Sequence, residues 1–224
     1  MNPHTVFITG GSGYLGKRLV SLLVRRGHIV RALVRKRSEE KLPPGCTPIT
    51  GNALDKTSFV DEIKPADTFV QLVGVAHPSP SKAAQFRAVD LVSVSASVAA
   101  AVETRIQHFV YVSVAHPAPL MKAYVEVRAE GELLIRSSGL NATILRPWYV
   151  LGPGHRWAWV LLPAYWLLEC LPATRDTARR LGLVTLGQML AALVGAVENP
   201  AAGIRVVEVP AIRQAGQNGG KRSA

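Results

Sequence analysis

Cysteine is scarce in this sequence. The 224 residues include only Cys46 and Cys170, which lie far apart with no second cysteine at a CxxC spacing. This argues against a disulfide scaffold and against a structural zinc site, and it is typical of a reducing compartment. The six histidines also lack the HxxxH and histidine–carboxylate spacings of a metal site. We therefore expect two apolar thiols, no metal and a cytoplasmic location.

Acidic residues are few as well, with 15 Asp and Glu against 26 Lys and Arg, for a formal net charge of +11. A basic surface attracts polyanions in general: nucleic acid, anionic lipid or phosphorylated ligands. The sequence has no helix-turn-helix, zinc-finger or RNP-type pattern, which makes nucleic acid an unlikely partner. Nine of the basic residues fall between Lys17 and Lys41, so part of the excess has a local explanation.

Long hydrophobic runs are also missing. The N-terminus lacks the basic region and long apolar stretch of a secretory signal, so we expect none. The most apolar segment, 157–171, is too short to span a bilayer and contains Pro163. Two interpretations remain: a segment that covers a pocket or forms a dimer, and an interfacial anchor whose three tryptophans lie on a membrane. The second would make the protein a peripheral protein at the inner face of a membrane.

Short β-rich runs alternate with helical patterns along most of the chain. This alternation predicts an α/β fold, a doubly wound parallel sheet of the Rossmann type with a small C-terminal appendage. We expect a single domain over 1–212, in which 151–185 is a substrate-side or interface segment, and a disordered tail over 213–224. The expected strands are 6–8, 29–34, 48–50, 68–75, 109–114, 142–145 and 205–209, and the later helices are 90–103, 125–138 and 186–198.

A glycine-rich loop follows the first strand. Gly10, Gly13 and Gly16 form a G-x-x-G-x-x-G pattern directly before a helix with leucines at helical spacing. Gly10 permits the sharp turn, Gly13 lets a pyrophosphate approach the backbone, and Gly16 lets the helix pack close to the sheet. The free N–H groups at the helix start would face the phosphates of a dinucleotide. The remaining members of the expected binding loop are Gly11, Ser12, Tyr14 and Leu15.

A basic cluster follows the second strand, where NAD-selective proteins of this fold have an acidic residue for the ribose hydroxyls. Here the residues are Arg35-Lys36-Arg37. A guanidinium pairs well with a 2′-phosphate, which favours NADP(H) over NAD(H), with Arg35 as first choice and Arg31 or Arg37 in reserve. The alternative is that these are solvated surface charges.

Seven motifs together resemble the atypical short-chain dehydrogenase/reductase superfamily, in its NmrA-like and complex I Rossmann-subunit-like branch, and the resemblance extends to about Pro210. This resemblance implies that Asn52, with Ala53 beside it, contacts the adenine, and that Val73 and Gly74 lie under the nicotinamide ribose. The motifs are Thr9-Gly-Gly-Ser-Gly-Tyr-Leu-Gly16, Val30-Arg-Ala-Leu-Val-Arg35, Gly51-Asn-Ala-Leu-Asp55, Phe109-Val-Tyr-Val-Ser113, Tyr124 through Glu132, Thr143-Ile-Leu-Arg-Pro147 and Gly152-Pro-Gly154.

The same resemblance implies catalysis by a Tyr-x-x-x-Lys pair assisted by a Ser or Thr. The chain departs from it, because the pair here is Tyr124 and Arg128. Arginine supplies charge and can hold a ribose, but it cannot give up a proton. Ser113 lies near the expected hydroxyl position, whereas the following position, where many members have the working hydroxyl, is Val114. Tyr124 is therefore either an active acid or a residue kept for cofactor binding and packing.

Two functions fit these observations. One is an NADP(H)-dependent oxidoreductase or epimerase-like enzyme acting on a small apolar substrate, with a pocket roofed by 153–172. The other is a non-catalytic dinucleotide-binding protein that senses NADP(H) or stabilises a partner, with 157–171 as its contact to a protein or membrane surface. His77 and His116 follow strand ends, where a substrate contact is one interpretation and surface histidine the other.

Overall fold

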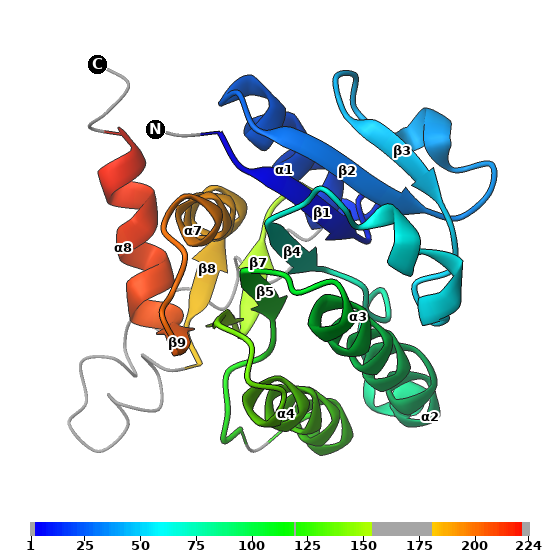
Figure 1. Ribbon diagram of the computed structural model, residues 1–224. Helices are drawn as coiled ribbons and strands as arrows, with labels where there is room; N and C mark the ends of the chain where they lie inside the picture. Colours follow the sequence, from blue (N-terminus) through cyan, green and yellow to red (C-terminus); the bar gives the residue numbers. More distant parts are fainter. Residues whose placement is uncertain (1–2, 119, 154–180, 221–224) are drawn as a thin grey trace.

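A computed structural model describes residues 3–118, 120–153 and 181–220 of the chain. Its centre is a seven-stranded sheet in the order β3-β2-β1-β4-β5-β6-β9, in which every neighbouring pair is parallel (Figure 1). The strands are β1 (Thr5–Thr9), β2 (Ile29–Val34), β3 (Thr47–Thr50), β4 (Thr68–Gln71), β5 (His108–Val112), β6 (Ala142–Arg146) and β9 (Ile204–Glu208). The strand order reverses between β1 and β4, which is the point where proteins of this fold bind ligands at the carboxyl ends of the strands.

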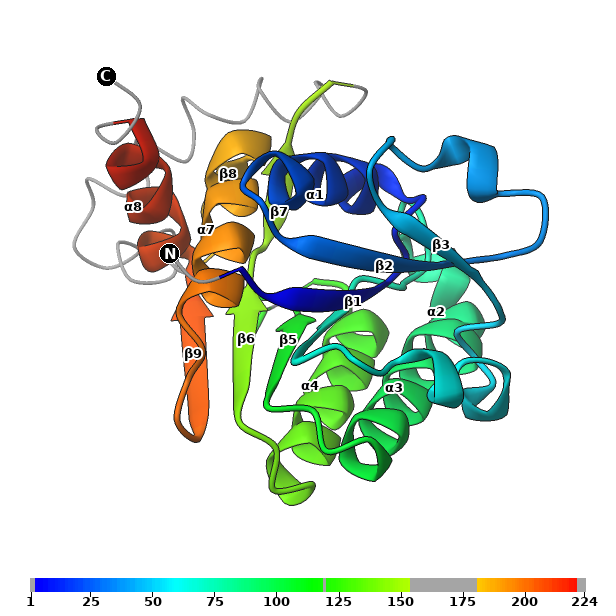
Figure 2. The same ribbon diagram turned by 45° about the horizontal axis from the view of Figure 1, so that its top comes forward.

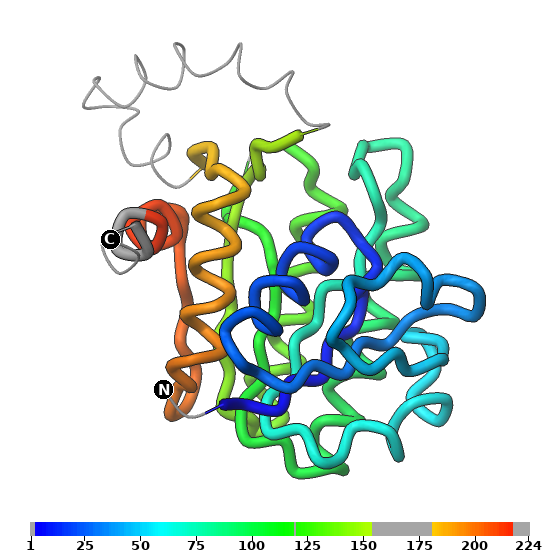
Figure 3. The backbone as a smooth tube through the Cα atoms, turned by 90° about the horizontal axis from the view of Figure 1, so that it is seen from above, coloured from blue at the N-terminus to red at the C-terminus, as the bar shows by residue number. Residues whose placement is uncertain are grey.

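Helices cover both faces of this sheet. Figure 2 shows α1 and α7 on one face and α3 and α4 on the other, and in Figure 3 α1 and α7 lie side by side. The predicted α/β class with a doubly wound parallel sheet is therefore confirmed. The helices are α1 (Tyr14–Arg25), α2 (Ala83–Gln85), α3 (Val92–Glu103), α4 (Lys122–Ser137), α7 (Leu186–Glu198) and α8 (Val209–Gly220).

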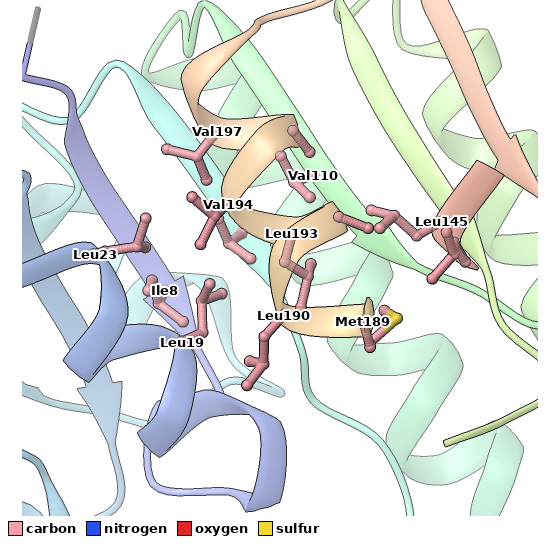
Figure 4. Close-up of a cluster of buried hydrophobic side chains, with 14 of the residues drawn as sticks. Ile8, Leu19, Leu23, Val110, Leu145, Met189, Leu190, Leu193, Val194 and Val197 are labelled. Carbon is pink, nitrogen blue, oxygen red and sulfur yellow. The ribbon is translucent and has the colours of Figure 1, made fainter. Parts of the chain in front are cut away.

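Each face of the sheet has its own hydrophobic core. Ile8, Leu19 and Leu193 are fully buried in the cluster between the sheet and helices α1 and α7 (Figure 4). Phe69 and Phe109 belong to the opposite cluster, where their rings stack 5.2 Å apart under α3 and α4. Because both faces are covered, the central strands β1, β4, β5 and β6 are buried along almost their whole length rather than at alternate residues.

Local signals explain where several helices begin and end. Thr185 and Gln188 form a capping box at the start of α7, with each side chain bonded to the other residue's backbone N–H. Gly139, with φ +75°, follows the end of α4, as expected of a residue that must adopt the left-handed region. By contrast the N-cap residue of α1 is Gly13, which has no side chain to cap the first turn.

Several segments differ from the sequence-based expectation. β4 ends at Gln71, and the residues after it form a loop rather than more strand. The next helical run begins at Pro80, before the expected start at 90, and includes a π-helical turn over Phe86–Leu91. The tail is not disordered over 213–220 but continues α8. Ile212 is fully buried against the core, and Arg213 Nε donates 3.0 Å to the carbonyl of Leu183, which the abundance of Gly and Gln concealed.

Two further strands, β7 (Tyr149–Leu151) and β8 (Leu183–Thr185), pair in parallel outside the main sheet. β7 ends where the segment 151–185 begins, and β8 forms the end of that segment. The apolar run 157–171, for which a pocket cover, a dimer contact or a membrane contact was expected, lies outside the described residues.

The helical run Pro80–Glu103 is long and apolar enough to span a membrane by length and composition. Val94, Ala100 and Ala101, on α3, are however fully buried under the sheet. The run is therefore a core helix of the domain.

A buried histidine at the start of β5 makes the stability of the folded protein depend on pH. His108 Nε2 lies 2.9 Å from Thr143 Oγ1, which itself accepts a hydrogen bond from Arg205. Burial, with the nearby charge of Arg205, lowers the pKa of His108 from 6.5 to about 4. The unfolded chain therefore binds a proton between these pH values that the folded chain does not, so stability is complete above pH 6.5 and falls as pH falls towards 4.

We expect this histidine to remove up to about 3 kcal/mol of the free energy of unfolding across that interval. Urea unfolding of the wild type and of His108→Gln, measured at several pH values from 7 to 4, checks it. The variant should show a shallower decline, and parallel curves would contradict the assignment.

Candidate cofactor and active site

The glycine loop between β1 and α1 has the geometry that a phosphate cradle requires. Gly10 has φ +76°, and its carbonyl accepts a hydrogen bond of 3.0 Å from the N–H of Gly13. A Cβ at Gly16 would collide with the carbonyl oxygen of Gly10, so only glycine lets α1 begin this close to the loop. The first turn of α1 has neither a side-chain cap nor an acidic residue, which leaves its positive end available to an anion.

A cleft of about 340 Å³ opens over this loop at the carboxyl ends of β1, β4 and β5. Its volume is within the range of small-molecule sites. The cleft brings the glycine loop together with the residues expected to act on a substrate, which come from β5 and α4. The expected site residues that line it are Gly10, Gly13, Tyr14, Leu15, Gly16, Gly74, Ser113, Tyr124 and Arg128.

The residues expected at the adenine end lie apart from this cleft, beyond β2 and β3. Arg35 is exposed immediately after β2, and Arg37 has a positive φ of 66°. The reserve candidate Arg31 is bound to Glu62, with Nη2 2.8 Å from the carboxylate. Asn52 is exposed, and its Oδ1 accepts a hydrogen bond from the N–H of Leu54. Gly11, Ser12, Ala53 and Val73 do not line the cleft either.

Arg128 lines the cleft although its side chain is almost fully buried. Its Nη2 donates 2.6 Å to Asp90 Oδ1, and its Nη1 donates 2.9 Å to the carbonyl of Val112. Its guanidinium also lies against the rings of Tyr111 and Tyr124. Burial acts to lower the pKa of Arg128, but the surrounding phenols and the Asp90 carboxylate outweigh it, so that the net shift is upward. Arg128 is a permanent cation here and cannot join a proton relay.

Asp90 is a site residue that the sequence analysis missed. It comes from the π-helical turn Phe86–Leu91, which packs against α4, and it is 1% exposed. Its second oxygen accepts 2.9 Å from the N–H of Val75, in the loop that lines the cleft. Burial raises the pKa of Asp90, opposed by Arg128. In the sequence, Asp90 stands alone in an apolar helical stretch and resembles a residue at a helix start. Its hydrogen bond with Arg128, 38 residues further on, forms only in the folded protein.

Tyr124 lies at the start of α4, where its ring packs 5.0 Å from that of Phe86 and 5.2 Å from the Arg128 guanidinium. Ser113 directly follows the last residue of β5 and lines the same cleft. Val114 is buried and also lines the cleft, so the hydroxyl that many relatives have at this position is replaced by an apolar wall.

Ser113 is held by a buried carboxylate. Its Oγ donates 2.6 Å to Glu132 Oε1, and Glu132 also accepts two hydrogen bonds from Arg146. His116 Nε2 lies 3.3 Å from the same oxygen. Burial acts to raise the pKa of Glu132, but the hydrogen bonds from Arg146 and Ser113 prevail and lower it. Ser113 therefore directs its proton to Glu132 and offers an acceptor oxygen to the cleft.

The two histidines that follow strand ends differ in position. His77 lines the cleft with φ 51°, whereas His116 contacts Glu132 behind Ser113. Over the described parts of the chain, no group of three or more His, Cys, Asp or Glu side chains is placed to hold a metal ion.

A family model described as NAD(P)H-binding matches residues 10–155, from the glycine loop to the residues just after β7. The chain belongs to this NAD(P)H-binding family. The match confirms the resemblance to atypical short-chain dehydrogenases/reductases and NAD(P)(H) as the cofactor class. The residues present fit such a cofactor, because the glycine cradle and the buried Arg128, whose Nε has no hydrogen-bond partner among the described residues, face one cleft.

Two curated relatives of this NAD(P)H-binding chain are reductases. It is 29% identical over 168 residues to a 4-hydroxy-2-methyl-3-oxo-4-farnesyl-3,4-dihydroquinoline-1-oxide ketoreductase of Stigmatella aurantiaca, covering 65% of this chain and 50% of that protein. It is 28% identical to the ceramide reductase of Caulobacter vibrioides over 94% of this chain and 66% of that protein. The chain thus spans half to about two thirds of the length of these relatives.

Among solved structures, the chain is similar to the Bordetella bronchiseptica enzyme WbmH, which was determined in complex with NAD+. The TM-score is 0.68 at 21% identity, over 92% of this chain and 75% of that chain. At this identity the likeness establishes the Rossmann architecture.

Proposed function

We propose that the protein is an NADP(H)-dependent oxidoreductase that interconverts a carbonyl group and an alcohol on a small apolar substrate. The observation that carries this proposal is the single cleft in which the phosphate cradle of α1 meets Ser113, Tyr124 and Arg128. Similarity to two reductases supports it.

An apolar substrate fits the walls of the cleft. One relative is named for a compound that bears a farnesyl group and the other for ceramide, and both names support a substrate with a large apolar part. The apolar wall residues are Leu15, Leu72, Val75, Ala76, Pro78, Val112, Val114, Pro147, Trp148 and Val150.

Each polar residue of the cleft has a separate task in this reaction. When bound, the reduced nicotinamide supplies the hydride for a carbonyl carbon. Tyr124 provides the proton for the carbonyl oxygen, because it lines the same cleft as Ser113 and its ring lies 5.2 Å from the permanent cation of Arg128. Arg128 stabilises the tyrosinate left behind and holds the ribose, but solvent rather than Arg128 must return the proton. Ser113, fixed by Glu132, accepts a hydrogen bond and so orients a hydroxyl within the cleft.

The choice of NADP(H) over NAD(H) depends on Arg35. Its exposed side chain leaves the end of β2, where the 2′-substituent of the adenosine ribose is bound in this fold. We expect Arg35→Glu to weaken NADPH binding by about 10- to 100-fold, because a phosphate contact becomes a repulsion, and to change NADH binding little. Titrations followed by nucleotide fluorescence measure both constants.

Lys36→Glu, the adjacent change of equal charge, is the matched control for Arg35→Glu. If both variants weaken NADPH equally, the effect is general electrostatics and Arg35 is not the specific contact. If Arg35→Glu leaves NADPH binding unchanged, the preference for NADP(H) is wrong.

A non-catalytic NADP(H)-binding protein is the second candidate. It is favoured by Arg128, whose charge is tied to Asp90, and by Val114 in place of a hydroxyl. Such a protein binds the nucleotide with the same residues but shows no turnover with any ketone.

A further inference from the structure

The ion pair of Asp90 and Arg128 lies beside Gly74 and Val75, at the end of the cleft formed by the loop after β4. We propose that Asp90 sets the relative affinity of the site for oxidised and reduced cofactor, by balancing the positive charge that Arg128 places beside the nicotinamide. This inference rests on the cofactor binding of the proposed function and assigns a task to a residue that does not itself line the cleft.

The pair lies directly against the backbone of the cleft wall. A Cβ at Gly74 would collide with Arg128 Nη2 and lie 3.0 Å from Asp90 Oδ1, so only a glycine allows this approach. Asp90 Oδ2 accepts a hydrogen bond from the N–H of Val75, the next residue of the wall. Both charges are therefore adjacent to the loop Gly74–Val75, with no side chain between them and it.

The topology places this loop at the nicotinamide end. The phosphates belong at the glycine loop before α1, and the adenosine belongs on the β2 and β3 side, where Arg35 and Asn52 lie. The other half of a dinucleotide must then extend the opposite way, over β4 and β5. That is where Gly74, Ser113 and Arg128 line the cleft.

The two redox states differ in charge at this end, because the oxidised nicotinamide ring is a cation and the reduced ring is neutral. Arg128 alone would repel the oxidised ring and leave the reduced ring unaffected. The Asp90 carboxylate, 2.6 Å from the Arg128 guanidinium, cancels most of this repulsion. At separations of roughly 7 Å in a partly buried site, an unbalanced charge changes an affinity by about tenfold or more.

The local backbone also singles out Asp90. Within the described chain, the π-helical turn Phe86–Leu91 interrupts the long helical run where Asp90 meets α4. Such turns are uncommon and are frequent at functional sites. A purely structural ion pair would need only mutual contact, whereas this one also fixes the cleft wall through Val75.

The experiment measures the dissociation constants of NADP+ and NADPH for the wild type and for Asp90→Asn, which keeps the size of the side chain and an acceptor for Val75. We expect the ratio of the NADP+ constant to the NADPH constant to rise about tenfold in the variant. Asp67→Asn is the matched control. The Asp67 carboxylate accepts hydrogen bonds from Thr5 and His4 at the opposite end of β4. Asp67→Asn should therefore lower stability without changing the ratio of the NADP+ and NADPH constants.

Arg128→Gln, measured at pH 9, is the second variant and keeps the proposal testable if Asp90→Asn does not fold. It leaves the carboxylate unbalanced, so the ratio should fall below the wild-type value. An unchanged ratio in either folded variant overturns the proposal, even if the thermal stability falls. A wild type that binds both nucleotides with no dependence on Asp90 leaves the proposed function standing, whereas a wild type that binds neither overturns both.

Discussion

Tyr124→Phe is expected to lower kcat by about 100-fold or more with little change in NADPH affinity. The substitution removes the phenolic hydroxyl, which is the proton source for the carbonyl oxygen, and general acid catalysis contributes factors of 10² to 10⁴. The ring remains to pack against Phe86 and Arg128, so folding and nucleotide binding should persist. Oxidation of NADPH in the presence of a panel of apolar ketones, followed by the loss of nicotinamide absorbance, measures the effect.

Tyr149→Phe is a suitable control, because it removes a tyrosine hydroxyl from β7, which belongs to the second, two-stranded sheet. Its kcat should remain within a factor of two or so of the wild type. If Tyr124→Phe turns over ketones at the wild-type rate, Tyr124 is not the acid. If the wild type turns over no ketone while binding NADPH, the non-catalytic alternative holds.

Gly13→Asp is expected to abolish nucleotide binding without unfolding the protein. Gly13 has a negative φ, and a Cβ there would meet only the carbonyl oxygen of Gly10, at 3.1 Å. Aspartate is a favoured N-cap residue and can stabilise the start of α1 by about 1 kcal/mol, offsetting this tight contact. Its charge, however, lies where the pyrophosphate must bind, so NADPH affinity should fall by about 100-fold or more.

Retained thermal stability together with lost NADPH affinity in Gly13→Asp would indicate that the aspartate charge repels the pyrophosphate. Gly13→Asn supplies a neutral cap of the same size and should lose much less affinity. Thermal unfolding and fluorescence titration of the two variants provide both quantities. NADPH binding by Gly13→Asp at the wild-type strength would show that the phosphates do not lie at this loop.

Much of the fold could be predicted because its signals are local. The strand at 29–34 and the helix at 186–198 have the predicted boundaries, since each is bounded by a glycine, a cap or a turn close in sequence. The glycine loop is a local signal too. The helix after Arg213 was missed because its stability comes from Ile212 in the core and from the contact with Leu183, neither of which a Gly- and Gln-rich segment reveals.

The site was predictable only where a motif spans few residues. Tyr124 and Arg128 belong to one helix and could be recognised together, and Ser113 follows its strand. Asp90 could not be recognised, because its partner lies on another helix and its position depends on a π-helical turn. In the same way, the direction of the Ser113 hydroxyl depends on its hydrogen bond to Glu132. In the sequence, Glu132 looks like any acidic residue on a solvated helix face.

The most direct test of the central claim, that one cleft joins a phosphate cradle to Ser113, Tyr124 and Arg128, is a titration of the purified wild-type protein with NADPH and with NADH. Nucleotide fluorescence follows the binding, because the reduced ring would enter an apolar environment beside Trp148. We expect saturable binding of both nucleotides, tighter for NADPH, with emission enhanced on binding. The absence of saturable binding for both would contradict the account.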